Sequence, residues 1–274
     1  MTSMHDHDWC QIHFPEVEAL ALIFSAAQYC LPTFLQTMPK LKVLILYNYS
    51  SQRATLSGLP SFPLPVQIRS VFLNKLRVPP LYDNCRSWER LEKLYICLCE
   101  GLENITRLDK EVEALNFPNI KEINIDHCSD LRELPAKLCN LASLQILSVT
   151  NCHLIQKLPE DLERLSSLRV LRLSTCPILS RLPPSICSLG KLEYLDISQC
   201  GNLKALPSKF DQLSKLEWLD MRECSGLKKL HKIKLESLKR VIIPDQAMEG
   251  EWLSLPHLTV ESVEERFSLD WLDE

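Results

Sequence analysis

The chain has 274 residues with a formal net charge of −4, and 46% of its residues are hydrophobic and 24% charged, a balance typical of a globular protein. The slight excess of acid and the lack of any basic stripe exclude a nucleic-acid-binding footprint. No apolar run reaches the ~18 residues that a membrane span requires, so we expect no membrane segment. The N-terminal sequence MTSMHDHDWC lacks the features of a secretory signal. We therefore expect a cytoplasmic location, or alternatively a nuclear one, and reduced thiols for the twelve cysteines.

The N-terminal region predicts a short lead-in followed by the first coils of a repeat. Residues 1–16 are polar, and we interpret them as the lead-in. An apolar frame L-x-x-L-x-L begins at Val17 and returns 24 residues later at Leu41. A looser third copy begins at Ile68, after a proline-rich connection, and a fourth begins at Leu91 and ends on Cys99. The middle of each frame favours a short strand with one face turned inward.

Between residues 120 and 230 the frame recurs regularly and carries a cysteine. Each copy fits L-x-x-L-x-L-x-x-C-x-x-L, and a Leu-Pro pair follows the cysteine in the first four copies. The interval before this stretch is five residues longer than a standard coil, and we place the excess at residues 106–116 on the outer side. Registered copies at a fixed interval are the signature of a leucine-rich repeat. The cysteines that mark the copies are Cys128, Cys152, Cys176, Cys200 and Cys224.

This spacing predicts an α/β solenoid, a leucine-rich-repeat horseshoe with a curved parallel sheet on its concave face. The cysteine follows as the chain leaves the strand, and the proline suits the first position of a helical turn, where no amide donor is needed. Apolar residues then recur at every third position, which predicts short helical or 3₁₀ turns on the convex face. One coil cannot bury its apolar face alone, so the coils must stack.

The C-terminal part predicts the end of the solenoid. A shorter coil opens at Leu238, and residues 258–260 offer a last strand. We therefore assign residues 17–260 to one solenoid of about eleven strands, and residues 261–274 to an acidic amphipathic tail. The apolar tail residues Phe267, Leu269 and Trp271 have no coil to cover, which makes them candidates for contact with a partner.

The concave face offers the main candidate binding surface. The third, fifth and seventh positions of each frame face away from the core, and the third becomes more aromatic toward the C-terminus. Aromatic anchors ringed by charges are typical of binding hot spots. The alternative, that Tyr194 and Trp218 pack on each other as an ordinary ladder between coils, stays open. The candidate protein-binding residues are Arg172, Tyr194, Asp196, Trp218, Asp220 and Arg222.

No motif predicts catalysis or a bound cofactor. The sequence contains no G-x-x-x-x-G-K-[ST], no G-x-G-x-x-G, no H-E-x-x-H and no G-x-S-x-G. His5, His7 and His13 lack the cysteine and histidine spacing of a zinc site. We therefore expect a protein that is not an enzyme and holds no metal or cofactor, because repeat solenoids typically use the concave face to bind other proteins.

Several stretches carry a family resemblance beyond the leucine pattern. They are HDWCQIHFPEVEALALIFSAAQYCLP, MPKLKVLIL, IDHCSDLRELP, LSVTNC, LEYLDISQC, LDMRECSG and the closing FSLDWLDE. The chain resembles the leucine-rich repeats of plant intracellular immune receptors of the nucleotide-binding leucine-rich-repeat (NLR) class. Within that class it is most similar to the helper receptors with a powdery-mildew-resistance-like coiled-coil domain.

The resemblance implies the sensing C-terminal part of such a receptor. In that family this region is a docking surface for lipase-like immune adaptor heterodimers, and engagement leads to cell death through a membrane pore. The coiled-coil and nucleotide-binding domains are absent from this sequence, so we expect this chain alone neither to bind nucleotide nor to enter a membrane. It is either a fragment of a receptor or a truncated relative.

Two other classes share parts of the pattern. Substrate-recruiting subunits of ubiquitin ligases carry cysteine-bearing repeats, but theirs usually continue with an Ile-Thr-Asp-like turn and follow an F-box. Scaffolds that assemble phosphatases and small GTPases share the Leu-Pro repeats, but they do not explain FSLDWLDE. Both remain alternatives to the immune-receptor interpretation.

Overall fold

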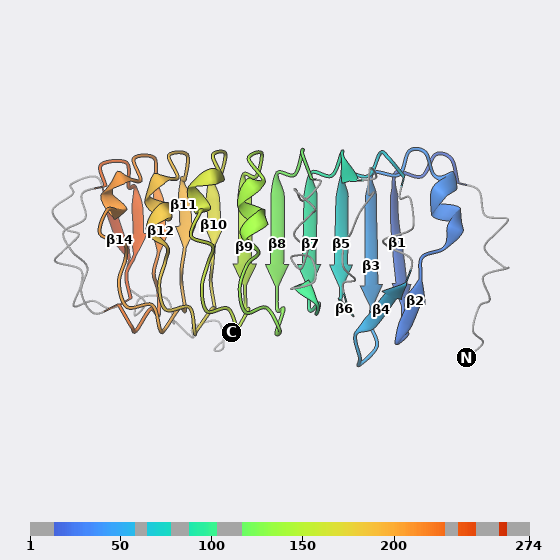
Figure 1. Cartoon of the computed structure of the whole chain (residues 1–274), viewed down its shortest axis with the longest axis horizontal. Helices are drawn as coiled ribbons and strands as arrows, with labels where there is room; N and C mark the ends of the chain where they lie inside the picture. The colour runs from blue at the N-terminus through green and yellow to red at the C-terminus, as the bar shows by residue number, and fades with distance from the viewer. Residues whose placement is uncertain are drawn as a thin grey trace, which may run out of the picture.

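The repeat folds into one continuous parallel sheet. A computed structural model describes residues 14–57, 65–77, 88–102, 117–227, 235–244 and 258–261. Within these ranges eleven strands lie side by side in chain order, as Figure 1 shows, which confirms the predicted solenoid class. The strands are β1 (Ala19–Phe24), β3 (Val43–Asn48), β5 (Ser70–Asn74), β7 (Lys93–Cys97), β8 (Glu122–Asp126), β9 (Ile146–Thr150), β10 (Val170–Arg172), β11 (Tyr194–Asp196), β12 (Trp218–Asp220), β13 (Arg240–Ile242) and β14 (Thr259–Glu261).

The core is a stack of equivalent leucines. Leu171 pairs in register with Leu147 on one side and with Leu195 on the other, and all three are fully buried. Because each coil covers the apolar face of the next, burial is complete in the middle of the stack. At the N-terminal end Leu20 is only half-buried. The stacking thus depends on neighbours on both sides.

The convex side carries short 3₁₀ turns, as predicted. The turns are η2 (Thr33–Thr37), η5 (Ala136–Asn140), η6 (Leu162–Arg164), η7 (Pro184–Ser188) and η8 (Phe210–Gln212). In η5 and η7 the proline of the Leu-Pro pair lies just before the turn, with extended backbone at Pro135 (φ −64°, ψ 134°) and Pro183 (φ −66°, ψ 144°), rather than at the first helical position that the sequence favoured. In η6 and η8 the residues before the turn are Asp161 and Lys209 instead. Within the described stretches no helix is long and apolar enough to cross a membrane.

The cysteine column joins successive coils through weak hydrogen bonds. Every cysteine in the described ranges is a free thiol. Burial raises the pKa of Cys200 to about 11 and that of Cys224 to about 12, so both remain protonated donors at neutral pH. Five thiols of the column donate to a backbone carbonyl of the preceding coil. The acceptors are Leu73 for Cys99 (3.6 Å), Ile96 for Cys128 (3.9 Å), Val149 for Cys176 (3.6 Å), Leu173 for Cys200 (3.0 Å) and Ile197 for Cys224 (2.9 Å).

A column of residues in the left-handed conformation lies just after strands β5, β7, β8 and β9 and in the turns that follow the shorter strands β10, β11 and β12. These residues carry side chains, although positive φ favours glycine, and Thr175 is even β-branched. The turn is held because their amides donate to the next coil, as in the 2.9 Å bond from Thr175 N to Ser198 O. The members of the column are Lys75, Leu98, His127, Asn151, Thr175, Gln199 and Glu223, with φ between 52° and 58°.

A second, smaller sheet was not predicted from the sequence. It contains β2 (Gln28–Cys30), β4 (Ala54–Ser57) and β6 (Leu76–Arg77) in parallel, beside the N-terminal coils. At its start Tyr29 stacks on Phe24 of β1, with ring centroids 3.7 Å apart. This contact covers the end of the core, where Phe24 is 9% exposed.

Candidate protein-binding surface

The sheet register brings the predicted residues together. Tyr194 of β11 aligns with Val170 of β10 and Trp218 of β12, and the column continues to Arg240 of β13. In the fifth-position column Asp196 lies between Arg172 and Asp220. The predicted neighbours are therefore correct, because stacked coils of equal length place equivalent strand positions side by side. The third-position column extends two residues further than predicted, to Arg240 of β13 and Thr259 of β14.

Two cations flank a pair of aromatic rings on this surface. The guanidinium carbon of Arg172 lies 5.0 Å from the Tyr194 ring centroid. The Tyr194 and Trp218 rings follow, with centroids 5.5 Å apart and planes tilted by 37°. Arg240 then lies over the Trp218 ring at 4.2 Å and forms an ion pair with Glu261. We call Arg172, Tyr194, Trp218 and Arg240 the cation–aromatic stack; such contacts hold side chains in place before any partner binds.

The two aspartates differ from the expected exposed charges. Asp220 is 1% exposed and Asp196 is 8% exposed. Each carboxylate lies along its own strand instead of pointing away from the sheet, because it accepts a hydrogen bond from the backbone amide two residues later. Asp196 Oδ1 accepts the amide of Ser198 at 2.9 Å and its hydroxyl at 2.6 Å. Asp220 Oδ1 accepts the amide of Arg222 at 3.1 Å.

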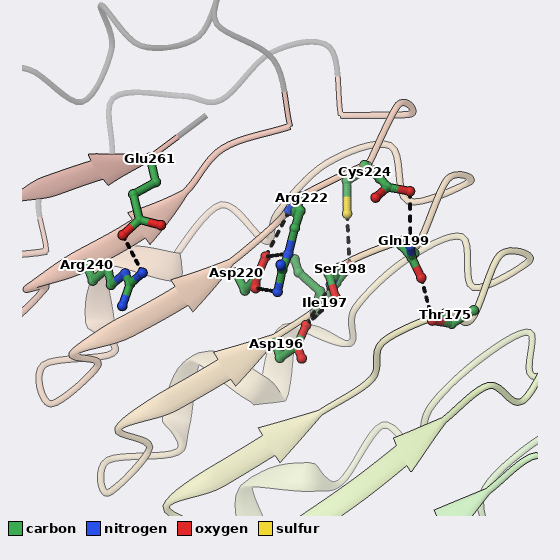
Figure 2. A network of polar contacts seen from close by, with 11 residues as sticks. Thr175, Asp196, Ile197, Ser198, Gln199, Asp220, Arg222, Cys224, Arg240 and Glu261 are labelled. Atoms are coloured by element: carbon green, nitrogen blue, oxygen red, sulfur yellow. Dashed lines mark hydrogen bonds and ion pairs between the residues drawn. The ribbon is translucent and has the colours of Figure 1, made fainter. Parts of the chain in front are cut away.

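Arg222 covers the buried Asp220. Its Nε donates to Asp220 Oδ1 at 3.2 Å and its Nη2 donates to Oδ2, and Figure 2 shows the guanidinium lying against the carboxylate. Burial raises the pKa of Asp220, although the bonds from Arg222 partly oppose this. The aspartates therefore lie buried below the surface, while Arg172 and Arg222 remain partly exposed on it.

Two donors in the stack lack acceptors among the described residues. The indole Nε1 of Trp218 and the Nε of Arg240 are both buried and without a hydrogen-bond partner there. Buried donors are nearly always paired, because leaving one unpaired costs roughly 1–3 kcal/mol.

The N-terminal coils present a second surface that the sequence analysis missed. Ile23 is 67% exposed and lies in register with Tyr47, which is 44% exposed. Farther along the sheet Phe72 stacks on Tyr95, with centroids 4.3 Å apart. The signal was present, because the outward positions of the first two frames hold only alanine, valine, isoleucine and tyrosine. We call Ile23, Tyr47, Phe72 and Tyr95, with the small residues between them, the N-terminal apolar surface.

Other candidate sites lie outside the structure or lack support in it. Phe267, Leu269 and Trp271 of the predicted tail are outside the described residues, as are residues 103–116, which include the predicted insertion. Among the described residues no group of three or more His, Cys, Asp or Glu could hold a metal ion.

Comparisons with known sequences place the chain beside plant disease resistance proteins. A probable disease resistance protein of Arabidopsis thaliana is 39% identical over 141 residues, which are 52% of this chain and 17% of that relative. Disease resistance protein ADR1 of the same plant is 35% identical over 131 residues, which are 48% of this chain and 16% of ADR1. The matched stretches therefore make up less than a fifth of either relative.

Solved structures share the architecture. The leucine-rich repeat domain of the type III effector XopL matches with a TM-score of 0.66 at 21% identity, covering 94% of this chain and 79% of that one. The structure of a TLR13–ssRNA13 complex matches with a TM-score of 0.67 at 15% identity, covering 95% and 39%. At these identities the likeness concerns the fold alone. A family model described as a leucine-rich repeat region matches residues 114–260, more than half of the chain, and the protein therefore belongs to the leucine-rich repeat family.

Proposed function

We propose that this chain is the partner-sensing leucine-rich-repeat region of a plant NLR immune receptor of the helper type. Its relatives are disease resistance proteins, which supports a role in defence through protein interaction. In this proposal the chain binds and does not catalyse, and it acts in the cytoplasm or the nucleus. The partner is a lipase-like immune adaptor heterodimer, and the docking site is the concave face of β10–β13.

The cation–aromatic stack is the observation that carries the proposal. Aromatic and arginine side chains dominate binding hot spots, particularly where they are held rigid before association. Arg172 and Arg240 hold the Tyr194 and Trp218 rings from both sides. The Trp218 indole donor has no acceptor among the described residues, and in this proposal a carbonyl or carboxylate of the partner accepts its hydrogen bond.

The test is the affinity of the purified chain for a purified lipase-like adaptor heterodimer, measured by isothermal titration calorimetry. Trp218→Ala removes the centre of the stack, and we expect a loss of about thirtyfold or more, since truncating a hot-spot aromatic costs ~2 kcal/mol or more. Asp220→Lys is unsuitable here, because Asp220 is buried and the change would disturb the fold. Tyr47→Ala is the matched control, an exposed concave aromatic at the other end of the sheet.

Three results would contradict the proposed surface. Full affinity in a folded Trp218→Ala variant would remove the stack from the interface. An equal loss of adaptor affinity in Tyr47→Ala would show that the adaptor does not bind preferentially to the C-terminal end of the concave sheet. Loss of binding only after removal of residues 266–274 would assign the contact to the tail that carries Phe267, Leu269 and Trp271.

A further inference from the structure

The outermost strand β1 lacks the features that normally protect a sheet edge. Natural edge strands carry charges, proline or bulges that prevent pairing with another chain. From residue 19 to residue 29 the sequence ALALIFSAAQY contains no charged residue and no proline. The concave side chains of the strand, Ala19, Ala21 and Ile23, are all exposed.

The backbone of the same three residues faces away from β3, toward the edge of the sheet that the described strands form. Val43 N donates to Glu18 O at 3.0 Å and Tyr49 N donates to Phe24 O at 2.9 Å, so the even-numbered residues of β1 face β3. Because alternate residues of a strand face opposite sides, the N–H and C=O groups of Ala19, Ala21 and Ile23 point away from β3. Among the described strands β1 is terminal in the sheet, with β3 as its partner there.

We infer that this edge is an interface for a second copy of the same chain. The two β1 strands pair antiparallel about a twofold axis beside Ala21, so that both concave faces lie on the same side. In this register Ala21 opposes Ala21 of the copy, and Ala19 opposes Ile23. Both backbone groups of each residue then bond across the axis, giving about six hydrogen bonds, since opposed residues of this type exchange both.

The strand is complementary to itself in this register. The bulky Ile23 meets the small Ala19, and the axis falls on the small Ala21, so no two large side chains collide on the concave face. On the core side Leu20, which is half-buried, meets Leu22 and gains apolar cover. Glu18 opposes Phe24, so no like charges face each other across the pair.

The N-terminal apolar surface makes the interface larger than the strand alone. Tyr47 lies beside Ile23 in the sheet, and Tyr49, which is 61% exposed, follows at the end of β3. An edge-strand contact is small by the standard of stable interfaces, so we expect a dimer with a dissociation constant in the roughly micromolar range.

Sedimentation velocity of the whole chain at rising concentration tests the interface. We expect a monomer–dimer equilibrium for the natural sequence. Ala21→Pro removes the central donor but keeps the bonds to β3, because the Ala21 amide faces the open edge. Ile23→Lys adds a charge at the interface. Both variants should weaken association tenfold or more, whereas Ile146→Lys, a half-buried concave position in the middle of the sheet, should associate like the natural chain.

Circular dichroism confirms that each variant is folded before its association is compared. A monomer at every concentration overturns the inference, and protection of the Ala19, Ala21 and Ile23 amides from hydrogen exchange in that monomer would show that another part of the same chain covers the edge. A dimer that survives both edge substitutions places self-association elsewhere and equally overturns it.

Discussion

The outward side chains differ between the two ends of the concave sheet, in their exposure and in their contacts with one another. On β1 and β3 these side chains are apolar, and they are exposed at Ile23 (67%) and Tyr47 (44%), whereas Val43 and Ile45 are half-buried. On β10–β13 the side chains contact one another, so that Trp218 lies between Tyr194 and Arg240. Both ends follow the same apolar frame, so the difference lies in the residues at the third, fifth and seventh positions and in the strands, which have six residues in β1 and β3 and three in β10–β13.

This difference separates two modes of recognition. A surface whose side chains are already held in place loses little entropy when a partner docks, which favours specific binding. An open strand with apolar side chains instead offers backbone hydrogen bonds, which any matching strand can satisfy. We therefore assign partner recognition to the cation–aromatic stack and self-association to the edge of β1.

The largest expected effect distinguishes the middle coils of the solenoid from the first coil. Leu195→Ala should lower the free energy of unfolding by roughly 2–5 kcal/mol, because Leu195 is fully buried between coils. Leu20→Ala truncates the same repeat position in the first coil, where the side chain is only half-buried, and should cost less than half as much. Urea denaturation measures both values, and equal losses would contradict a stacked core that weakens toward its end.

Two aspartates on the concave face should respond to pH in opposite directions. Burial raises the pKa of Asp220 above its usual 3.8. Its ionisation therefore destabilises the folded state as pH rises from 3.8 through the raised pKa. At Asp126 burial acts the same way, but bonds from Thr150, Asn151 and His127 outweigh it and lower the pKa. Asp126 therefore contributes stability above pH 3.8 that is lost as pH falls through its lowered pKa.

The asparagine variants of these residues make the difference measurable. Relative to the natural chain, Asp220→Asn should become more stable as pH rises from about 3 to 7, and Asp126→Asn should become less stable. Urea denaturation across this range gives both trends. If the relative stability of both variants fell as pH rises, the Arg222 ion pair would be shown to compensate the burial of Asp220.

The smallest expected effect concerns the left-handed column. Thr175 adopts φ 55°, which costs a β-branched residue roughly 1–2 kcal/mol, whereas asparagine tolerates it, as Asn151 already does in the same column. Thr175→Asn should raise stability by about 1 kcal/mol, or about 2 °C in Tm, less a small loss from its 2.7 Å bond to Gln199. Ser174→Asn, just outside the column, is the control, and an equal gain there would exclude backbone strain as the cause.

The sequence predicted what depends on repeat length, and missed what depends on local hydrogen bonding. The 24-residue interval gives the register that aligns Tyr194 with Trp218, because stacked coils place equivalent residues side by side. The same pattern could not show that the Asp220 carboxylate accepts a hydrogen bond from the Arg222 amide, because an outward strand position only implies an exposed side chain. Thr175 likewise gives no sign of positive φ, since that turn is held by a bond to the next coil.

The smaller sheet shows the same limit. Strands β2, β4 and β6 have two to four residues each, too few for an alternating pattern to be visible in the sequence. They pair because the stacked coils bring them side by side, so their existence follows from the tertiary structure and not from local preference. The exposure of Ile23, in contrast, was readable from the outward positions of the first frame.

The separation of the two surfaces is tested most directly by measuring two variants in two assays. Trp218→Ala and Ile23→Lys are each titrated with the lipase-like adaptor heterodimer and each analysed by sedimentation velocity for self-association. We predict that Trp218→Ala loses adaptor affinity about thirtyfold and associates normally, whereas Ile23→Lys binds the adaptor normally and remains a monomer. If either folded variant lost both properties, or neither variant lost its own, the assignment of separate roles to the two ends would be contradicted.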